Sequence, residues 1–296
     1  MILGIDVGGT TIKFGVVDNK GNIVKTERFI TKDHCANAEN FIELIKSCSE
    51  KLVKEYAISG IGIGVPGQLS FDGKTIVNLT NIPTLNGLNV VNPIQKHFPN
   101  LKIVLENDAR CAAMGEYHFG THSLSTFLLV ALGTGVGGGL IVNGEIFKGA
   151  HGNPTEVGMI PVGKGEYLED YIGNRQIVEF TQNLLKDFPD SILKEEKELT
   201  VEKIYTAAKK GDVCSLEVFN HVGKLLGQAI ISMVHLYDVH TIIIGGGVGN
   251  AFDIIEPIVM DVLKAKLIHY YLDDFKLLPA SNHSDTGIIG AASLVK

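Results

Sequence analysis

The sequence contains few cysteines, only four in 296 residues, at positions 35, 48, 111 and 214. They are widely spaced, they form no C-x-x-C pair, and no histidine stands beside them at the spacing of a metal site. This pattern suggests neither a zinc knuckle nor a disulfide framework. Scattered cysteines of this kind are typical of a reducing compartment, so we expect a cytoplasmic protein.

Long apolar runs are also missing. No stretch approaches the roughly 20 apolar residues that a membrane-spanning helix needs. The first residues, MILGIDVGGTTIKFG, are apolar only briefly and include Asp6 and Lys13, so they predict a strand rather than a signal peptide. We therefore expect no membrane partner.

An excess of positive charge is the third absence. Lys and Arg together number 26 against 33 Asp and Glu, which gives a formal net charge of −7. Proteins that bind nucleic acid neutralise phosphates with clustered Lys and Arg, and this chain lacks that electrostatic footprint. A small-molecule partner is the better expectation.

Glycine, by contrast, is abundant and gathers in turns that follow predicted strands. Residues 2–17, ILGIDVGGTTIKFGVV, predict a strand, a glycine turn and a second strand, because β-branched residues flank the Gly8-Gly9 pair. Residues 127–142, FLLVALGTGVGGGLIV, repeat this arrangement, and Asn143-Gly144 predicts the next turn. The same supersecondary unit therefore occurs twice.

Further helices and strands follow each copy of this unit. Apolar residues at helical spacing predict a helix over 38–57, and the strand SGIGIGV comes next. Later segments predict helices near 168–186, 200–210 and 213–237, a strand over 241–245 and a C-terminal helix in TGIIGAASLV. Alternation of this kind predicts an α/β protein with two lobes on mixed sheets. We place the lobes at residues 1–118 and 119–283.

The first glycine turn has the features of a phosphate-binding loop. Gly8 and Gly9 lack Cβ atoms, so backbone N–H groups there can approach a phosphate, and Thr10 adds a hydroxyl donor. Asp6 can position Mg²⁺ through water, and Lys13 can face the phosphates from the second strand. A simple hairpin turn explains the same residues equally well.

Two more glycine turns follow later strands. Gly133, Thr134 and Gly135 begin a G-x-G-x-x-G pattern, but the segment LIVNGEIF after it predicts a strand, whereas a dinucleotide fingerprint must open a helix. Gly246 and Gly247 follow the strand TIII. Backbone without side chains there can lie against a nucleotide base or ribose. An ordinary strand-to-helix turn is the alternative. Three such turns together favour binding of a phosphate donor.

The candidate catalytic residue is Asp108. The segment ENDA follows the predicted strand KIVL and opens a predicted helix, which places Asp108 in the first helical turn. The helix dipole there favours a carboxylate, so we expect Asp108 to stay ionised and to accept a hydroxyl proton. An ordinary helix cap is the alternative, because Asn and Asp are the commonest capping residues.

Other side chains offer the amide and carboxylate groups that bind sugar hydroxyls. They are Asn81 in NLTNIP, Glu156 and Glu169. Each of them, taken alone, is equally well explained as a turn or surface residue. His151, in the loop GAHGNP, has the features of a structural or solvent-facing histidine.

Together these motifs resemble the ROK family of sugar kinases and sugar-responsive repressors over essentially the whole chain. The resemblance rests on DVGGTTIK at 6–13, GVPGQL at 64–69, ENDA at 106–109, LGTGVGGGLIVNGEIFKGAHG at 132–152, EVG at 156–158, LE at 168–169 and IIIGGGV at 242–248. Their order and spacing make the match specific.

The resemblance implies a duplicated, ribonuclease H-like α/β fold, the actin-like ATPase fold, with two lobes around a central cleft. It implies that a C-terminal helix over about 284–296 returns to the first lobe. ATP with Mg²⁺ would be held by the glycine turns, and the sugar would bind near the hinge. Family members are commonly dimers, so a homodimer is expected.

The resemblance also implies roles for individual residues. Asp108 would be the general base, with the asparagines contacting the sugar and the glutamates holding its ring hydroxyls. The sugar-binding set would be Asn81, Asn107, Asp108, Glu156, Glu169 and Gly67. The ATP-binding set would be Asp6, Gly8, Gly9, Thr10, Lys13, Gly133, Thr134, Gly135, Gly246 and Gly247.

The chain departs from the family pattern in two places. Met159 stands where many members have a histidine, and PVGKGEY stands where they have a zinc-binding cysteine cluster, so no structural zinc is expected. Repressors of the family carry a DNA-binding domain before the DxGGT motif. Here that motif begins at residue 6, so we expect a protein of the kinase branch without a nucleic-acid partner.

The predicted function is transfer of the γ-phosphoryl group of ATP to a hexose, with glucose at its 6-hydroxyl as the first expectation. An N-acetylhexosamine, fructose or a β-glucoside remains open as acceptor, because pocket shape decides among them. A non-catalytic sugar sensor would keep the fold without needing Asp108. An actin-like assembly protein would have no reason for the ENDA and EVG motifs.

Overall fold

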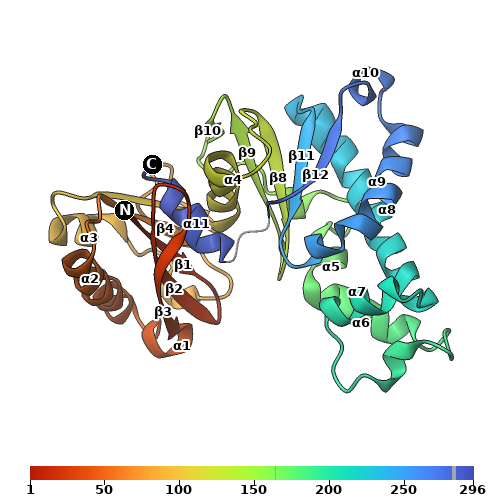
Figure 1. Ribbon diagram of the computed structural model, residues 1–296, viewed down its shortest axis with the longest axis horizontal. Coiled ribbons are helices and arrows are strands. Elements are labelled where there is room, and N and C mark those ends of the chain that lie inside the picture. Colours follow the sequence, from red (N-terminus) through yellow and green to blue (C-terminus); the bar gives the residue numbers. More distant parts are fainter. Residues whose placement is uncertain (164, 282–284) are drawn as a thin grey trace. The chain divides into compact units, whose positions relative to one another are not determined.

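The computed structural model describes residues 1–163, 165–281 and 285–296. The chain divides into two compact units (Figure 1). Unit 1 comprises Met1–Ser125, Gly139–Pro154 and Ser281–Lys296, and unit 2 comprises Thr126–Gly138 and Thr155–Ala280. The lobes expected at 1–118 and 119–283 stay a prediction.

Unit 1 is built on a five-stranded sheet of order β3-β2-β1-β4-β7. The strands β1 (Ile2–Val7), β2 (Thr11–Val17) and β3 (Ile23–Ile30) form an antiparallel meander. The strands β4 (Gly60–Val65) and β7 (Lys102–Asn107) run parallel to β1. The strand, turn and strand predicted over residues 2–17 are confirmed.

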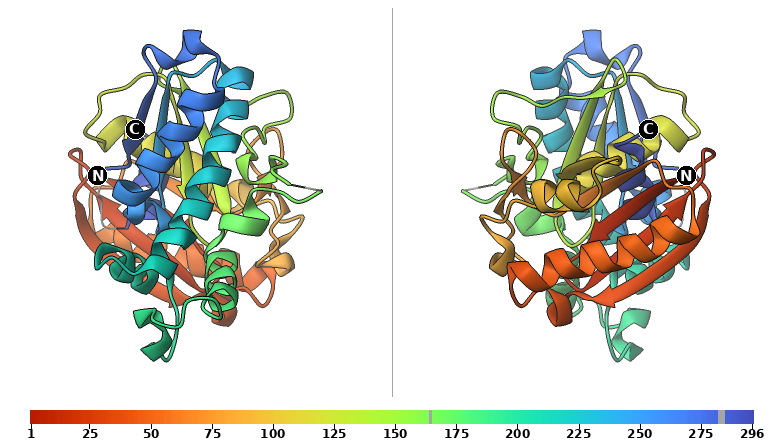
Figure 2. Two further views of the ribbon diagram at one scale, coloured as in Figure 1. Left: turned by 90° about the vertical axis from the view of Figure 1, so that its right-hand side faces the viewer. Right: turned by 90° about the vertical axis from the view of Figure 1, so that its left-hand side faces the viewer.

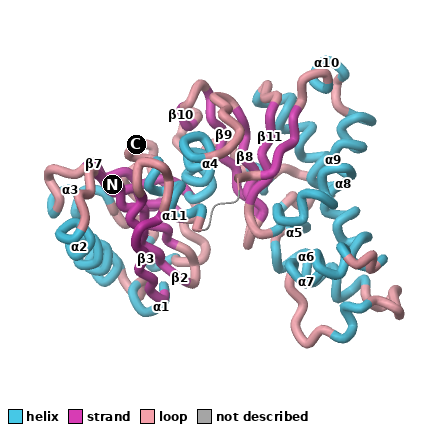
Figure 3. Tube along the Cα trace, viewed as in Figure 1, coloured by secondary structure: helices cyan, strands magenta, loops and turns pink. Residues whose placement is uncertain are grey.

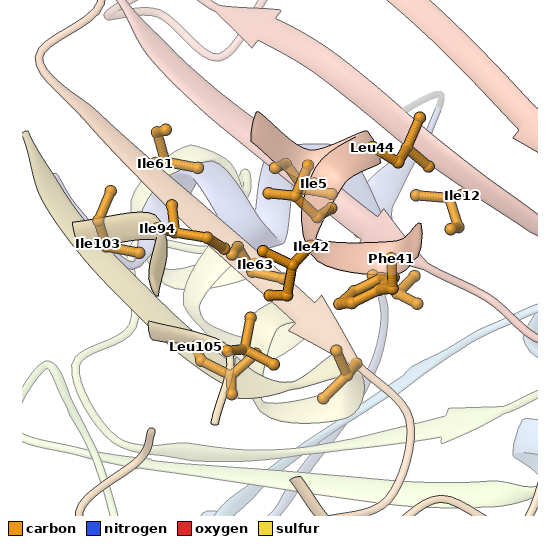
Figure 4. Packing of buried hydrophobic residues seen from close by; sticks show 14 of the residues in the cluster. Ile5, Ile12, Phe41, Ile42, Leu44, Ile61, Ile63, Ile94, Ile103 and Leu105 are labelled. Atoms are coloured by element: carbon orange, nitrogen blue, oxygen red, sulfur yellow. The ribbon is translucent and has the colours of Figure 1, made fainter. Parts of the chain in front are cut away.

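Helices α2 (Ala38–Glu55) and α3 (Val91–His97) cover one face of this sheet. The helix α2 begins after Asn37, whose side chain accepts a hydrogen bond from the Asn40 N–H group, and it lies along the strands in the right-hand view of Figure 2. Strand side chains alternate between the two faces, and those facing these helices are apolar. Figure 4 labels part of this core: Ile5, Ile12, Phe41, Ile42, Leu44, Ile61, Ile63, Ile94, Ile103 and Leu105.

The opposite face of the sheet is lined with glycine and carries α4 (Asp108–Phe119) and α11 (Thr286–Ser293). Gly15, Gly4 and Gly62 are direct neighbours across β2, β1 and β4. A Cβ atom on Gly4 would lie 2.1 Å from the Ile288 carbonyl oxygen. The C-terminal helix thus packs backbone against backbone on the sheet of unit 1, which only glycine allows.

The second sheet has the order β10-β9-β8-β11-β12. Its strands are β8 (Phe127–Leu132), β9 (Val136–Val142), β10 (Glu145–Ile146), β11 (Thr241–Gly245) and β12 (Lys276–Pro279), and β11 runs parallel to β8 and β12. The turn predicted at Asn143-Gly144 is confirmed, with both residues at positive φ.

The helices of unit 2 are α5 (Glu169–Ile172), α6 (Asn174–Leu184), α7 (Val201–Lys209), α8 (Val213–Tyr237), α9 (Phe252–Lys266) and α10 (His269–Leu272). The left-hand view of Figure 2 shows α8 and α9 side by side, where Gly223 of α8 faces Ile258 of α9. The helical structure predicted near 168–186 is confirmed as two helices, α5 and α6, with a break at Gly173. Gly173 has extended backbone, and the next N–H group, on Asn174, donates to the Gly133 carbonyl.

Short elements complete the described chain (Figure 3). They are α1 (Thr31–His34), β5 (Gln68–Leu69), β6 (Ile76–Asn78) and the 3₁₀ turns η1 (Pro83–Leu85), η2 (Val157–Met159), η3 (Ile192–Glu195) and η4 (Val248–Ala251). No helix within the described ranges has the length and apolar character to cross a bilayer. All four cysteines are buried and free.

Candidate active site

The candidate residues of unit 1 lie where three neighbouring parallel strands end. Asp6 on β1 stands opposite Gly64 on β4, and Gly64 stands opposite Glu106 on β7. Gly8–Thr10 follow β1 and Gly67 follows β4, while Asn107 ends β7 and Asp108 begins α4. The carboxyl ends of parallel strands are where α/β proteins bind their ligands. The fold thus gathers the unit 1 candidates at one edge of one sheet.

Three hydrogen bonds hold the glycine turn after β1. The Gly8 N–H group donates to the Thr11 carbonyl at 3.0 Å, the Thr31 hydroxyl donates to the Gly8 carbonyl at 2.7 Å, and the Thr31 N–H group donates to the Thr10 carbonyl at 2.9 Å. Gly9 and Thr10 are exposed residues, and within the described chain their N–H groups meet no acceptor. Successive open N–H groups of this kind can bind phosphate oxygens.

Asn81 lies beside this turn. Its Cβ atom is 3.4 Å from the place where a Cβ on Gly9 would stand, and the residue is exposed. The structure therefore brings one predicted sugar-binding side chain next to the predicted phosphate-binding turn.

Asp6 and Lys13 are cross-strand partners just before and after the turn. The Lys13 Nζ atom is 3.8 Å from the Asp6 Oδ2 atom. Burial raises the pKa of Asp6; Lys13 opposes this change, and the carboxylate of Asp285 adds to it. A carboxylate whose charge is incompletely balanced has capacity to attract a cation.

Asn107 and Asp108 divide two tasks at the start of α4. Asn107 is the helix cap: its Oδ1 atom accepts from the N–H groups of Ala109 at 3.0 Å and Arg110 at 3.2 Å, and its Nδ2 atom donates to the Gly67 carbonyl at 3.2 Å. Asp108 is the first helical residue. Since Asn107 performs the capping, the alternative explanation of Asp108 as the cap is not supported.

Asp108 is exposed when the whole residue is considered, yet many protein atoms surround its carboxyl group. The reduced hydration raises its pKa to about 6; the Asp6 carboxylate contributes in the same direction, while the Ala109 N–H group and Arg110 oppose it. The helix N-terminus favours the ionised carboxylate, as expected from the sequence, but desolvation is the larger effect and sets the direction of the pKa shift. At pH 7 the group is still mostly ionised.

An ion cluster around the buried Glu106, which the sequence analysis missed, supports this segment. The Arg110 Nε atom donates to the Glu106 Oε1 atom at 2.7 Å, and Lys148 bonds the other oxygen of Glu106. Glu106 and Arg110 are each 2% exposed. Burial opposes ionisation of Glu106, but the two cations outweigh it and lower its pKa. The i,i+4 spacing of Glu106 and Arg110 was the available signal.

In unit 2, Glu169 holds the second glycine turn. Its Oε2 atom accepts from the Val136 N–H group at 2.8 Å, and a Cβ on Gly135 would lie 2.4 Å from that oxygen. Gly133 closes the turn by donating to the Gly135 carbonyl at 2.9 Å. Glu169, predicted as a sugar ligand, therefore also fixes the turn that contains Thr134.

The third glycine turn lies next to the second. Gly246 has a φ of +81°, and a Cβ on it would lie 2.2 Å from the carbonyl oxygen of Leu132, which immediately precedes Gly133. A Cβ on Gly247 would meet nothing within 4 Å. Because β8 and β11 are parallel neighbours, the two turns share one edge of the sheet, as the predicted ATP-binding set requires.

The remaining candidates belong to different units of the chain. Glu156 is exposed and precedes η2, and Met159 is 44% exposed in the same segment of unit 2. His151 lies in the unit 1 loop that Asn153 fastens to Leu69 through two hydrogen bonds, at 2.9 and 2.7 Å. No group of three or more His, Cys, Asp or Glu residues within the described ranges has the geometry of a metal site.

The model of the ROK family matches residues 2–296. The chain belongs to the ROK family. Its fold is the actin-like ATPase fold, as predicted, because solved structures of this family superpose on nearly all of it.

Individual relatives of this ROK protein have informative names. A crystal structure of a proposed sugar kinase from Cytophaga hutchinsonii is 38% identical, covers 100% of this chain and 99% of its own, and superposes with a TM-score of 0.94. A ROK family glucokinase from Streptomyces griseus, solved with glucose and AMPPNP, is 26% identical over 99% of this chain and 98% of its own, with a TM-score of 0.82. A Halalkalibacterium halodurans glucokinase is 29% identical and aligns over 99% of this chain and 94% of its own.

Proposed function

We propose that this ROK protein is an ATP-dependent sugar kinase that phosphorylates a hexose, with glucose at its 6-hydroxyl as the first acceptor. The observation that carries the proposal is Asp108, an exposed residue in the first turn of α4 whose carboxyl pKa is raised to about 6. Such a group is ionised at pH 7 and basic enough to accept the proton of an attacking hydroxyl. Similarity to two glucokinases, one of them solved with glucose and AMPPNP, supports the same assignment.

The two oxygens of Asp108 have different surroundings. Its Oδ1 atom accepts the Ala109 N–H group at 2.8 Å, whereas no described residue donates to its Oδ2 atom. In the proposed reaction the sugar hydroxyl gives its proton to Oδ2 of Asp108 while the hydroxyl oxygen forms a bond to the γ-phosphorus of ATP. The bond to the β–γ bridging oxygen breaks, and the products are a sugar phosphate and ADP.

The glycine turns bind the nucleotide in this proposal. The open N–H groups of Gly9 and Thr10, with Lys13, contact phosphates, and the turns at Gly133–Gly135 and Gly246–Gly247 hold the rest of the nucleotide. Asp6 offers one carboxylate, which fits Mg²⁺ because that ion keeps several waters and phosphate oxygens as ligands. When bound, the ion neutralises charge on the transferred phosphoryl group.

The sugar is proposed to contact Asn81, Asn107, Gly67, Glu156 and Glu169. Met159, 44% exposed where many family members have histidine, motivates a second set of acceptors: N-acetylhexosamines, fructose and β-glucosides.

We further propose a cytoplasmic homodimer, on the family resemblance and the four free cysteines. Light scattering of the purified chain checks the dimer.

A coupled ADP-release assay with Mg-ATP tests the proposal against a panel of hexoses, N-acetylhexosamines and β-glucosides. We expect one sugar class to drive ADP release far above the sugar-free rate, with the largest kcat/KM for glucose. Preference for another class would replace glucose and leave the kinase assignment in place. Binding of a sugar with no ADP release by any member of the panel would favour the non-catalytic sensor and reject the kinase.

A further inference from the structure

A row of charged residues crosses the sheet of unit 1 beside the first glycine turn. Arg28 on β3 is the cross-strand partner of Lys13 on β2, and Lys13 is the partner of Asp6 on β1. Cross-strand partners point to the same face of a sheet, so the two cations lie directly opposite each other. Like charges in that arrangement repel and destabilise the pairing.

Asp285 compensates this repulsion from outside the sheet. The Lys13 Nζ atom lies 3.2 Å from the Asp285 Oδ1 atom. The Arg28 Nη2 atom donates to both oxygens of Asp285, at 3.2 and 2.9 Å. The Asp285 side chain is 19% exposed against 29% for Lys13 and 56% for Arg28, so the carboxylate is the innermost member of the group.

The backbone of Asp285 is fixed by the helix that follows it. Asp285 has left-handed backbone, with φ 54° and ψ 50°, and its carbonyl accepts from the N–H groups of Ile288 at 2.9 Å and Ile289 at 3.3 Å. Ile288 is fully buried, and a Cβ on Gly287 would lie 2.4 Å from the Asp6 Cγ atom. Because α11 is wedged against the sheet, the Asp285 carboxylate is a fixed point, and the flexible Lys13 side chain adapts to it.

Lys13 thus lies between two carboxylates, 3.2 Å from Asp285 and 3.8 Å from Asp6. We infer that Asp285 is a positioning residue for nucleotide binding. It holds the Lys13 ammonium group away from Asp6, in a position from which Lys13 contacts the phosphates of ATP. The inference rests on the proposed function. Without the Asp285 charge, Arg28 repels Lys13 and Asp6 attracts it. The Lys13 ammonium group then pairs with the Asp6 carboxylate, which is the group that would bind a phosphate-bound Mg²⁺.

The variant Asp285→Asn tests this inference with little change to the backbone. Asn tolerates left-handed backbone as Asp does, so the substitution removes charge without adding strain. We expect the KM for Mg-ATP to rise about tenfold, the size of one charge-assisted contact. The KM for the sugar is expected to stay within twofold, and calorimetric affinity for adenosine, which has no phosphate, is expected to stay unchanged.

A double-mutant cycle shows whether Asp285 acts through Lys13. In a Lys13→Met background, Asp285→Asn is expected to have no further effect on Mg-ATP affinity, because the residue through which it acts is gone. Additive losses would overturn the inference. So would equal losses for Mg-ATP and adenosine in the single variant, since those would indicate a general disturbance of the fold.

Two further variants are the controls. Asp33→Asn removes an exposed carboxylate from α1 in the same unit and is expected to leave the affinity for Mg-ATP unchanged. Arg28→Gln keeps the Lys13–Asp285 pair and is expected to change Mg-ATP affinity less than threefold; a loss as large as that of Asp285→Asn would overturn the inference. A wild-type chain that binds no Mg-ATP would reject the proposed function itself, whereas a sugar kinase indifferent to Asp285→Asn would reject the inference alone.

Discussion

The Gly62 backbone lies so close to Ala291 that a Cβ atom on Gly62 would stand 1.8 Å from the Ala291 carbonyl oxygen. This contact joins β4, an interior strand of the unit 1 sheet, to α11. The clashing atom belongs to the backbone, so it cannot move aside as the end of a flexible side chain would. A single methyl group at Gly62 therefore has to displace the helix.

We predict that Gly62→Ala destabilises the protein by about 3 kcal/mol or more, at the upper end of overpacking effects. Gly64→Ala on the same strand face is the matched variant, because its Cβ would meet the Cys111 Sγ atom at 3.1 Å, a side-chain atom able to shift. Its expected cost is about 1 kcal/mol or less. Urea unfolding measures both, and hydrogen exchange shows whether α11 amides lose protection. If the two variants lose the same stability, the contact with α11 is not the reason that position 62 requires glycine.

The pH profile of activity is predicted to report Asp108. Since the pKa of Asp108 is raised to about 6, the carboxylate becomes protonated below that pH and loses the ability to accept a proton. We expect kcat/KM to be level above pH 7 and to fall about tenfold per pH unit below pH 6. An ordinary carboxyl, with a pKa of about 3.9, would keep the activity level to about pH 5. A level profile down to that pH would contradict the claim that desolvation raises the pKa of Asp108.

The same shift has a consequence for stability. The pKa of Asp108 rises from the ordinary aspartate value of 3.8 in the unfolded chain to about 6 in the folded chain, which therefore binds the proton more tightly. The stabilising contribution of this group is fully present below pH 3.8 and is lost as pH rises through 6. Asp108→Asn is expected to remove this contribution, which a comparison of urea midpoints at pH 5 and pH 7 measures. An unchanged pH dependence in the variant would contradict the raised pKa.

Glu169 is predicted to have two separable roles. In Glu169→Gln the amide oxygen still accepts the Val136 N–H group, so the glycine turn is kept while the charge is lost. We expect the sugar KM to rise about tenfold with an unchanged KM for Mg-ATP. Glu169→Ala removes both functions and is expected to raise both constants. If the glutamine variant also raises the KM for Mg-ATP, the two roles cannot be separated and this assignment is wrong.

Local patterns predicted most of the secondary structure. The strands at residues 2–17 and the turn at Asn143-Gly144 form as expected, because β-branched residues and glycine act over a few neighbouring positions. The interruption at Gly173 was not predicted, since it depends on a hydrogen bond from Asn174 to the distant Gly133. The alternating glycines of GIGIGV were recognised as a strand but not as the surface on which α11 packs.

Long-range contacts also limit what could be predicted for the site. The first-turn position of Asp108 follows from its local sequence, but the direction of its pKa shift depends on the protein atoms packed around it. The Lys148 partner of Glu106 is 42 residues away, and the Asp285 partner of Arg28 is 257 residues away. Such pairs leave no local pattern in a single sequence.

The most direct test of the central claim compares wild type with Asp108→Asn by detecting the phosphorylated sugar itself. Each protein is incubated with Mg-ATP and its best acceptor, the product is quantified by mass spectrometry, and sugar binding is measured by calorimetry. Asn has nearly the same shape as Asp and cannot accept the proton, so we expect the variant to bind sugar within a fewfold of wild type. Its kcat is expected to fall about 10²- to 10⁴-fold. A variant that keeps more than a tenth of the wild-type kcat would show that Asp108 is not the base.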